Sequence, residues 1–315
     1  MAIETPKQAY TGKIRQVQVG KGEGSFLVGG QSSYPFHLFE GEAPHPPRIA
    51  FEVADVPPAA WGSDLEEIFG GVGGDPAAWA RKCVDEFKAD MIHVDLGGTD
   101  PGGDNLGPDH AVGVVRKVVQ AVKVPVAVWG SGNVEKDGEV LRAVAEALAG
   151  TQLLLGPIQE GNYKQLGAAA IGYHHVAIAS SPIDVNLAKQ LNVLLGNLGV
   201  PDGSILIDPT VGGVGYGLEY TYSVMERTRM AALVQQDERL QFPMYCNLGR
   251  EVWKTKEARQ PEAEAPALGR ARERGVMMEI ATAVSLLMAG ADILVVRHPD
   301  TAALLRGLIR ELRGT

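Results

Sequence analysis

The chain has 315 residues, enough to bury a large hydrophobic core in one domain or in two. Hydrophobic residues make up 45% and charged residues 21%, as in ordinary globular proteins, and the formal net charge is −9. Binding to a polyanion needs a clustered basic face, which this acidic balance disfavours. We therefore expect no nucleic-acid partner.

The sequence carries no targeting or membrane signal that we recognise. The first residues, MAIETPKQAYTGK, lack the basic flank and the apolar core of a signal peptide. The most apolar window, residues 283–296, is interrupted by Asp292 and is too short to span a bilayer. The two cysteines, Cys83 and Cys246, have no metal-binding spacing and form no disulfide framework. We expect a cytoplasmic protein without a membrane span.

Residues 1–47 form an N-terminal arm that is separate from the pattern that follows. The runs KIRQVQV and SFLVGG, joined by GKGEG, predict a β-hairpin with a glycine-containing turn. This arm carries four basic and four acidic residues, so the net negative charge lies on the remainder of the chain. The arm is expected either to plug the bottom of the following domain or to contact a partner, and the sequence leaves both open.

From residue 48 onward, short apolar runs alternate with amphipathic stretches of helical period. One helix is expected over residues 184–199, with Asp184 as its N-cap and Gly199 at its carboxyl end. Eight nearly continuous apolar strands, each followed by a helix, predict an α/β fold, a TIM (β/α)8 barrel over residues 48–315 with an N-terminal β-hairpin extension. A doubly wound open sheet is the alternative. The apolar runs are residues 48–55, 91–97, 125–130, 152–158, 175–180, 204–210, 243–249 and 293–299.

The loops after these strands are candidates for a binding site, because ligands of such barrels lie at the carboxyl ends of the strands. Two loops are long, residues 56–75 and residues 250–274, which is typical of lids and partner surfaces. Glycine lets a backbone approach a ligand closely. The glycine-rich loops are residues 70–74, 97–103, 129–133 and 211–217.

Polar side chains at the ends of the predicted strands are expected to converge on one pocket. Asp95, Asp208 and Asn247 end the second, sixth and seventh strands. Carboxylates and an amide are suited to the N–H and C=O edges of a pterin ring. Alternatively, Asp208 caps the Asp-Pro turn and Asn247 bonds to the local backbone. Other polar residues at strand ends are Asn133, Arg297 and His298.

Motifs for metal binding and bond chemistry are not recognisable in the sequence. The histidines form no HExxH motif, His174 and His175 are expected to point in different directions, and His93 is expected in the core. The loop 211–217 matches neither a Walker motif nor a dinucleotide-binding motif. We see no catalytic triad and no lysine at a strand end for a Schiff base. The site is therefore expected to hold a large cofactor, with no catalytic residue and no metal ligand.

Five motifs are distinctive, namely GGQSSYPFHLFEG, PHPPRIAFEVADVPP, HVDLGGTDPGG, LIDPTVGGVGYG and CNLGREVWKTKE. Together they resemble the small subunit of the corrinoid iron–sulfur protein, which is related to the delta subunit of the acetyl-CoA decarbonylase/synthase complex. In that family a heterodimer carries a methyl group on a cobamide in the reductive acetyl-CoA (Wood–Ljungdahl) pathway. The methyl group comes from a methyltetrahydrofolate methyltransferase and goes to acetyl-CoA synthase. The resemblance covers nearly the whole chain.

The resemblance implies a partner subunit that holds most of the cofactors. The large corrinoid iron–sulfur subunit would bring the [4Fe–4S] cluster and the cobamide-binding domain, and the barrel of this chain would close over the corrin. Two cysteines cannot ligate a four-cysteine cluster, and no D-x-H-x-x-G motif occurs. The chain would thus be a non-catalytic subunit of a methyl carrier.

The expected cofactor contacts follow from position in two loops. Two other functions remain open: an autonomous pterin-dependent methyltransferase or pteroate-type synthase, and a purely structural barrel subunit. A methyltransferase or synthase would use Asp95, Asp208 and Asn247 and bind folate by itself. The expected cobamide contacts are Thr210, Gly212, Gly213, Gly215, Tyr216, Asn247, Arg250 and Glu251.

Overall fold

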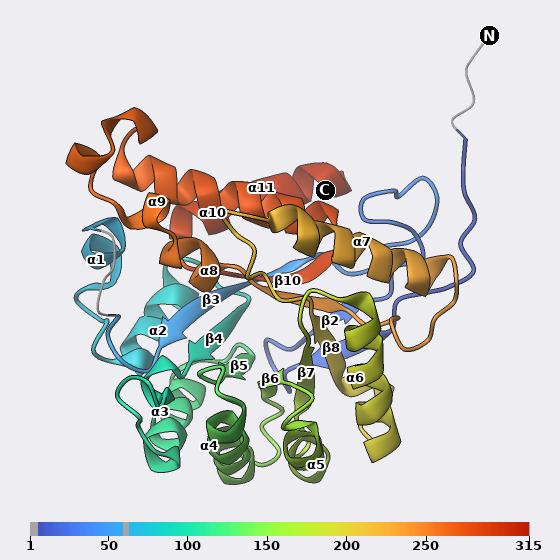
Figure 1. Cartoon of the computed structure of the whole chain (residues 1–315), viewed down its shortest axis with the longest axis horizontal. Helices are drawn as coiled ribbons and strands as arrows, with labels where there is room; N and C mark the ends of the chain where they lie inside the picture. Colours follow the sequence, from blue (N-terminus) through green and yellow to red (C-terminus); the bar gives the residue numbers. More distant parts are fainter. Residues whose placement is uncertain (1–5, 59–62, 315) are drawn as a thin grey trace.

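The computed structural model describes residues 6–58 and 63–314 of the chain. Eight parallel strands close into a barrel in the order β10-β3-β4-β5-β6-β7-β8-β9, and helices surround it (Figure 1). The predicted TIM barrel is confirmed, and the open sheet is wrong. The strands are β3 (Arg48–Ala54), β4 (Met91–Asp95), β5 (Val126–Trp129), β6 (Leu154–Ile158), β7 (Val176–Ser180), β8 (Ile205–Asp208), β9 (Met244–Asn247) and β10 (Ala291–Val296).

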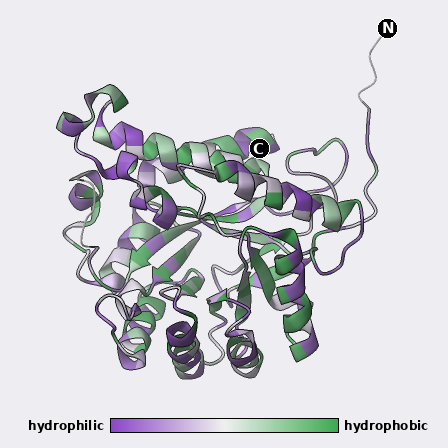
Figure 2. Cartoon of the chain, in the orientation of Figure 1, coloured by the Kyte–Doolittle hydropathy of each residue, from purple (hydrophilic) through white to green (hydrophobic). Residues whose placement is uncertain are grey.

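Most residues of the barrel strands are hydrophobic (Figure 2), because the interior and the helical layer bury both faces of the sheet. Several strands end earlier than the apolar runs predicted. β4 ends at Asp95, because Gly97 begins a short 3-10 turn, and β8 ends at Asp208, because Pro209 has no N–H for strand pairing. The two carboxylates therefore lie at the carboxyl ends of their strands.

The helices begin and end where local capping groups place them. The Asp184 carboxylate accepts hydrogen bonds from the N–H groups of Asn186 (2.7 Å) and Leu187 (3.0 Å), and Gly199 adopts a left-handed conformation, as predicted. The helices are α1 (Ser63–Phe69), α2 (Pro76–Asp85), α3 (Pro108–Ala121), α4 (Val134–Ala147), α5 (Tyr163–Tyr173), α6 (Val185–Leu198), α7 (Leu218–Leu233), α8 (Gly249–Lys254), α9 (Lys256–Arg259), α10 (Ala271–Met288) and α11 (Pro299–Arg313).

The arm forms the predicted antiparallel hairpin, β1 (Gln16–Val19) with β2 (Phe26–Gly29). Its buried side chains lie in one cluster with inward-facing residues near the amino-terminal ends of the barrel strands. The hairpin therefore plugs the amino-terminal end of the barrel. The cluster includes Val17, Val19, Phe26 and Val28 from the hairpin and Ala50, Met91, Ala127, Leu154, Val176 and Leu206 from the barrel.

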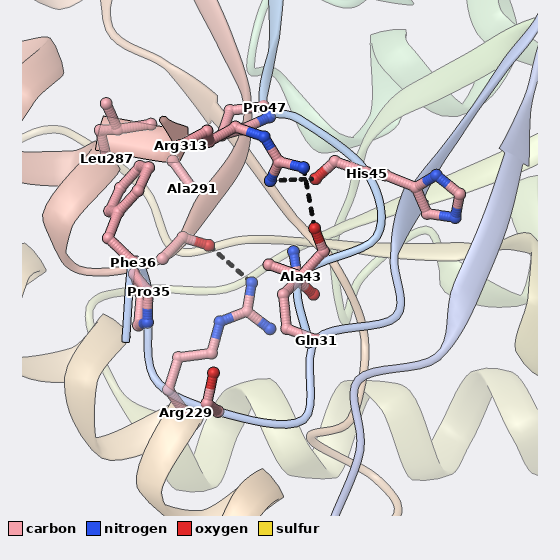
Figure 3. A pocket seen from close by; sticks show the side chains of 12 residues that line it. Gln31, Pro35, Phe36, Ala43, His45, Pro47, Arg229, Leu287, Ala291 and Arg313 are labelled. Atoms are coloured by element: carbon pink, nitrogen blue, oxygen red, sulfur yellow. Dashed lines mark hydrogen bonds between the residues drawn. The ribbon is translucent and has the colours of Figure 1, made fainter. Parts of the chain in front are cut away.

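Buried charges attach the rest of the arm to the barrel. Arg229 of α7 and Asp292 of β10 form an ion pair at 2.6 Å, and Gln31 donates to the other oxygen of Asp292 at 2.6 Å. Arg313 of α11 donates to the carbonyl of Ala43 at 2.9 Å (Figure 3). The cavity enclosed here is about 30 Å³, the share of one water molecule in the liquid, so it does not qualify as a ligand site.

Both cysteines are buried and free of disulfide bonds. Burial raises the pKa of the Cys83 and Cys246 thiols, so each packs as a small neutral hydrophobic group. Over residues 6–58 and 63–314, none of the helices combines the length and the apolar character needed to cross a membrane.

The plug can be tested with adjacent residues that face opposite sides of β1. Val17 is fully buried and Gln16 is exposed. We expect Val17→Ala to lower the free energy of unfolding by about 2 kcal/mol, because it leaves a cavity under the barrel. Gln16→Ala should change it by less than about 0.5 kcal/mol. If chemical denaturation shows the same loss of unfolding free energy for both variants, the hairpin does not plug the barrel.

Candidate functional site

A cavity of about 220 Å³ opens at the carboxyl ends of the barrel strands. We call this site the mouth cavity. Five of the eight expected cofactor contacts line it, so residues of both loops face the same cavity. Gly213, Gly215 and Tyr216 lie in the same loop but are not among the lining residues. The five lining residues are Thr210, Gly212, Asn247, Arg250 and Glu251.

Apart from Asp208, which was expected in the pocket, the further lining residues were not expected from the sequence. Ser131 and Gly132 lie in a glycine-rich loop that was noted, and Ser180 ends an apolar run, so a polar residue at a strand end was the available signal. The closure of the barrel decides which loops face the same cavity. The sequence alone does not reveal that arrangement. The remaining lining residues are Trp129, Pro157, Gln159, Asp208, Val211 and Lys254.

Asp208 combines a local and a long-range role. One carboxylate oxygen accepts from the N–H of Thr210 at 3.0 Å, so the expected Asp-Pro turn is present. The other accepts from the hydroxyl of Ser180 on the neighbouring strand at 2.7 Å. Burial raises the pKa of Asp208 to about 6, although both hydrogen bonds oppose the shift. The carboxylate is therefore mainly ionised at neutral pH, at an energetic cost.

Thr210 has a strained backbone. Its φ is +60°, a region that a β-branched residue rarely adopts. The Thr210 hydroxyl donates to the carbonyl of Ser181 at 2.5 Å, and Thr221 donates to the carbonyl of Thr210 at 3.0 Å. These bonds hold the strained conformation against the mouth cavity. Such strain is typical of functional positions.

Different physical constraints account for the glycines at different positions of the loop 211–217. Gly215 has φ +92°, which favours glycine, and a Cβ at Gly213 would lie 2.5 Å from the carbonyl oxygen of Gly217. A Cβ at Gly212 would meet only a methyl group of Thr210, at 3.8 Å, and its φ is not positive. The packing of the described chain therefore explains Gly213 and Gly215, but it does not explain Gly212.

Asn247 takes part in a buried network across the barrel. Its side-chain nitrogen donates to Nε2 of His93 at 3.2 Å, which leaves Nδ1–H of His93 to donate to the Tyr245 hydroxyl at 2.5 Å. The expectation that Asn247 bonds to the local backbone is wrong, because β9 aims its side chain inward. Burial lowers the pKa of His93 to about 4, so the ring is neutral and belongs to the core, as expected.

Two carboxylates on neighbouring strands are paired with arginines. Arg250 lies 3.6 Å from Asp95 and donates to the carbonyl of Ser131 at 3.3 Å. Burial raises the pKa of Asp95 to about 6, although Arg250 opposes this. Arg297 forms an ion pair with Glu52; burial opposes the charge on Glu52, yet the arginine holds its pKa below the usual value. Of the three residues expected to converge on one pocket, Asp208 and Asn247 line the mouth cavity. Asp95 lies at the same end of the barrel but is not among the lining residues.

Three buried acceptor atoms at this end have no hydrogen-bond partner in the described part of the chain. They are Oδ1 of Asn247, Oδ1 of Asp95 and Oε2 of Glu52, in residues that are at most 6% exposed. Buried acceptors are almost always paired, so each of these requires a donor from outside the described residues, either a water molecule or a ligand. This observation could not come from the sequence, since it depends on where each oxygen points.

The two long loops are attached to each other near His298. Nε2 of His298 donates to Asp64 of α1 at 2.6 Å, and Trp253 of α8 stacks on the imidazole with ring centroids 6.0 Å apart. Arg272 of α10 lies 3.6 Å from Asp64 and donates to Asp300 at 2.8 Å. Residues 59–62 of the first long loop lie outside the described residues. His298 therefore joins the loops beside the mouth cavity and does not line it.

Two aromatic rings beside the mouth cavity face solvent. Tyr216 is 85% exposed and Tyr220 is 65% exposed. The Tyr216 hydroxyl donates to the carbonyl of Gly212 at 2.8 Å, which fixes the ring over the loop. Exposed tyrosines are enriched at binding surfaces, so this edge of the mouth is suited to a partner.

The adjacent histidines point in different directions, as expected. His174 is exposed at the end of α5, whereas His175 is buried and donates from Nε2 to the carbonyl of Ala145 at 2.9 Å. Within residues 6–58 and 63–314, no group of three or more metal-ligating side chains is found.

Replacing the charged Asp208 tests its electrostatic cost. Because its pKa rises from 3.8 to about 6 on folding, the ionised form destabilises the fold above about pH 6. We expect Asp208→Asn to raise the free energy of unfolding by roughly 1–2 kcal/mol at about pH 8. The gain should disappear below about pH 4, where both states bind the proton. A gain independent of pH in denaturant titrations would refute this origin.

Comparisons with known proteins agree with the motifs. The family model described as "CO dehydrogenase/acetyl-CoA synthase delta subunit" matches residues 16–311. The acetyl-CoA decarbonylase/synthase complex subunit delta of Archaeoglobus fulgidus is 36% identical over 326 residues, covering 99% of this chain and 71% of the relative. The Methanothermobacter thermautotrophicus protein of the same name is 36% identical, covering 96% and 76%.

Solved structures share the fold at low sequence identity. The dihydropteroate synthase of Xanthomonas albilineans with 4-aminobenzoic acid has a TM-score of 0.59 and 15% identity, covering 90% of this chain and 99% of that one. The Thermus thermophilus enzyme in complex with 6HMPPP has a TM-score of 0.55 and 16% identity, covering 89% and 98%. At this identity the likeness establishes the barrel fold alone. The match over residues 16–311 and the relatives at 36% identity establish that the chain belongs to the CO dehydrogenase/acetyl-CoA synthase delta subunit family.

Proposed function

We propose that this chain is the small subunit of a heterodimeric methyl carrier, and that its mouth cavity and surrounding loops cover a cobamide held by a larger iron–sulfur subunit. The observation that carries the proposal is Gly212, a glycine at the edge of the mouth cavity that its own chain does not require. Family membership supports the same function. The partners would be the large corrinoid iron–sulfur subunit, a methyltetrahydrofolate methyltransferase and acetyl-CoA synthase.

The residues at the mouth fit the edge of a corrin. Gly212 leaves room for close approach, and Thr210 holds the loop in a fixed strained conformation. Asn247 and Arg250 offer a hydrogen-bond acceptor and a donor that a polar ligand would use. The cavity of about 220 Å³ is smaller than a corrin ring, so the macrocycle would lie across the mouth.

The cobamide would supply the cobalt that accepts and releases the methyl group. The part of this chain is to bind one face of the macrocycle and exclude water from it. The loops 211–217 and 247–257 are the segments in contact, and they would have to separate from the cobamide when donor and acceptor proteins approach. The [4Fe–4S] cluster belongs to the partner in this proposal.

A second candidate is an autonomous pterin-dependent methyltransferase or pteroate-type synthase. The observation in its favour is that two carboxylates and an amide lie at the same end of the barrel. A visible absorption spectrum of the complex and of the isolated chain distinguishes the two. Corrinoid and iron–sulfur bands only in the complex support the methyl carrier; a colourless chain that has no large partner and binds methyltetrahydrofolate tightly supports the enzyme.

Filling the space beside Gly212 should weaken cobamide binding without unfolding the chain. We expect Gly212→Val to increase the dissociation constant of the cobamide from the complex about tenfold, because the new side chain would project into the contact. Gly172→Val is the control, since a Cβ at Gly172 meets nothing within 4 Å and the residue lies in α5, near the other end of the barrel. Retention of corrinoid absorbance after gel filtration is the measurement. Equal retention by both variants would exclude contact at Gly212.

Hydrogen exchange locates the contact surface directly. In the cobamide-loaded complex, amides of residues 211–217 and 247–257 should exchange at least about tenfold more slowly than in the isolated chain. Because partner binding alone also protects amides, the cobamide-free complex is the control. Unchanged exchange in both loops on loading would contradict the proposed covering role.

A further inference from the structure

The mouth cavity is small, and its lining includes an unpaired hydrogen-bond acceptor and a guanidinium donor. Pockets that enclose a whole drug-sized ligand usually measure about 300–1,000 Å³, whereas this cavity is about 220 Å³. It therefore suits a pendant group better than a macrocycle. Its lining supplies one buried acceptor without a partner among the described residues, Oδ1 of Asn247, and one guanidinium, Arg250.

Neighbouring residues hold both groups in place. The His93 ring fixes the Asn247 amide through its nitrogen, at 3.2 Å, so the amide oxygen remains free. Arg250 is positioned by Asp95 at 3.6 Å and by the carbonyl of Ser131 at 3.3 Å. A guanidinium has five N–H donors, and these two contacts leave donors available. The site thus offers an acceptor and a donor to the same small guest.

Building on the proposed function, we infer that the mouth cavity binds a primary carboxamide at the rim of the corrin. A carboxamide has two N–H donors and one carbonyl acceptor. One N–H donates to Oδ1 of Asn247, and the carbonyl accepts from Arg250. Pairing the buried oxygen of Asn247 removes the cost of leaving it unsatisfied. Asp95 acts as a positioning residue, because it holds the guanidinium of Arg250.

The assignment adds chemical selectivity to the close approach at Gly212. Contact at Gly212 restricts the distance to the macrocycle but does not test the chemistry of its rim. The polar cavity does test it, because only a side chain that carries N–H groups satisfies Asn247. An ester of the same length lacks those donors and leaves the acceptor unpaired.

The test compares two corrinoids that differ in these donors. The complex of this chain with its co-purifying partner is depleted of corrinoid and then titrated with cobinamide or with cobyrinic acid heptamethyl ester, which carries no N–H groups at its rim. Uptake is followed by visible absorbance. The preference is the dissociation constant of the ester divided by that of cobinamide. This ratio should be at least about tenfold larger for the wild-type complex than for the Asn247→Ala complex. Asn247→Asp keeps an acceptor and should retain the preference.

Controls separate a specific loss from misfolding. Asn186→Ala changes an exposed amide on α6 that does not line the mouth cavity and should leave the preference intact. Thermal melting of every variant complex reports whether it is folded. Asp95→Asn should weaken uptake of cobinamide and of the ester by similar factors, because it loosens Arg250, whose partner is a carbonyl that both corrinoids carry.

Each outcome has one meaning. Loss of the preference in Asn247→Ala together with its retention in Asn247→Asp supports the carboxamide site. If the wild-type complex takes up both corrinoids equally, the inference fails while the covering function stands. If it takes up neither, the proposed function fails. A pterin presents similar N–H groups, so displacement of cobinamide by added methyltetrahydrofolate would reassign the cavity to a pterin.

Discussion

The hairpin β1–β2 closes the amino-terminal end of the barrel, and the distribution of polar groups depends on this closure. Val17, Val19 and Val28 share a buried cluster with the strand starts, so the lower half of the interior is hydrophobic. The polar residues that end the strands therefore gather at the opposite end. A mouth that is open on one side only is what allows a cofactor to lie across it.

Burying ionised carboxylates at the mouth costs free energy of folding, and neighbouring groups set the size of that cost. Asp95 and Asp208 each have a pKa of about 6 because they are buried, while Glu52 keeps a low pKa through Arg297. Buried carboxylates with a raised pKa, such as Asp95 and Asp208, destabilise the fold when ionised unless a ligand or a partner interacts with their charge. Together with strained Thr210, they mark this end of the barrel as the functional end.

Binding better accounts for the site than bond chemistry. The mouth offers a close-approach glycine, an unpaired amide oxygen and an oriented guanidinium, all of which hold and orient a ligand. The exposed ring of Tyr216 beside them is suited to a partner surface. A subunit that covers one face of a cofactor needs these properties, and it leaves the reacting atom to the cofactor.

The sequence by itself determined the barrel, because eight buried strands with helices between them leave a regular pattern. It also determined Asp184 as a helix cap and identified five residues that line the mouth cavity, since strand ends of a barrel meet at one end. Only the tertiary structure decided that Asn247 turns to His93 and keeps a free oxygen, and that Gly212 has open space. Those properties depend on side-chain directions across strands distant in sequence, which no local pattern encodes.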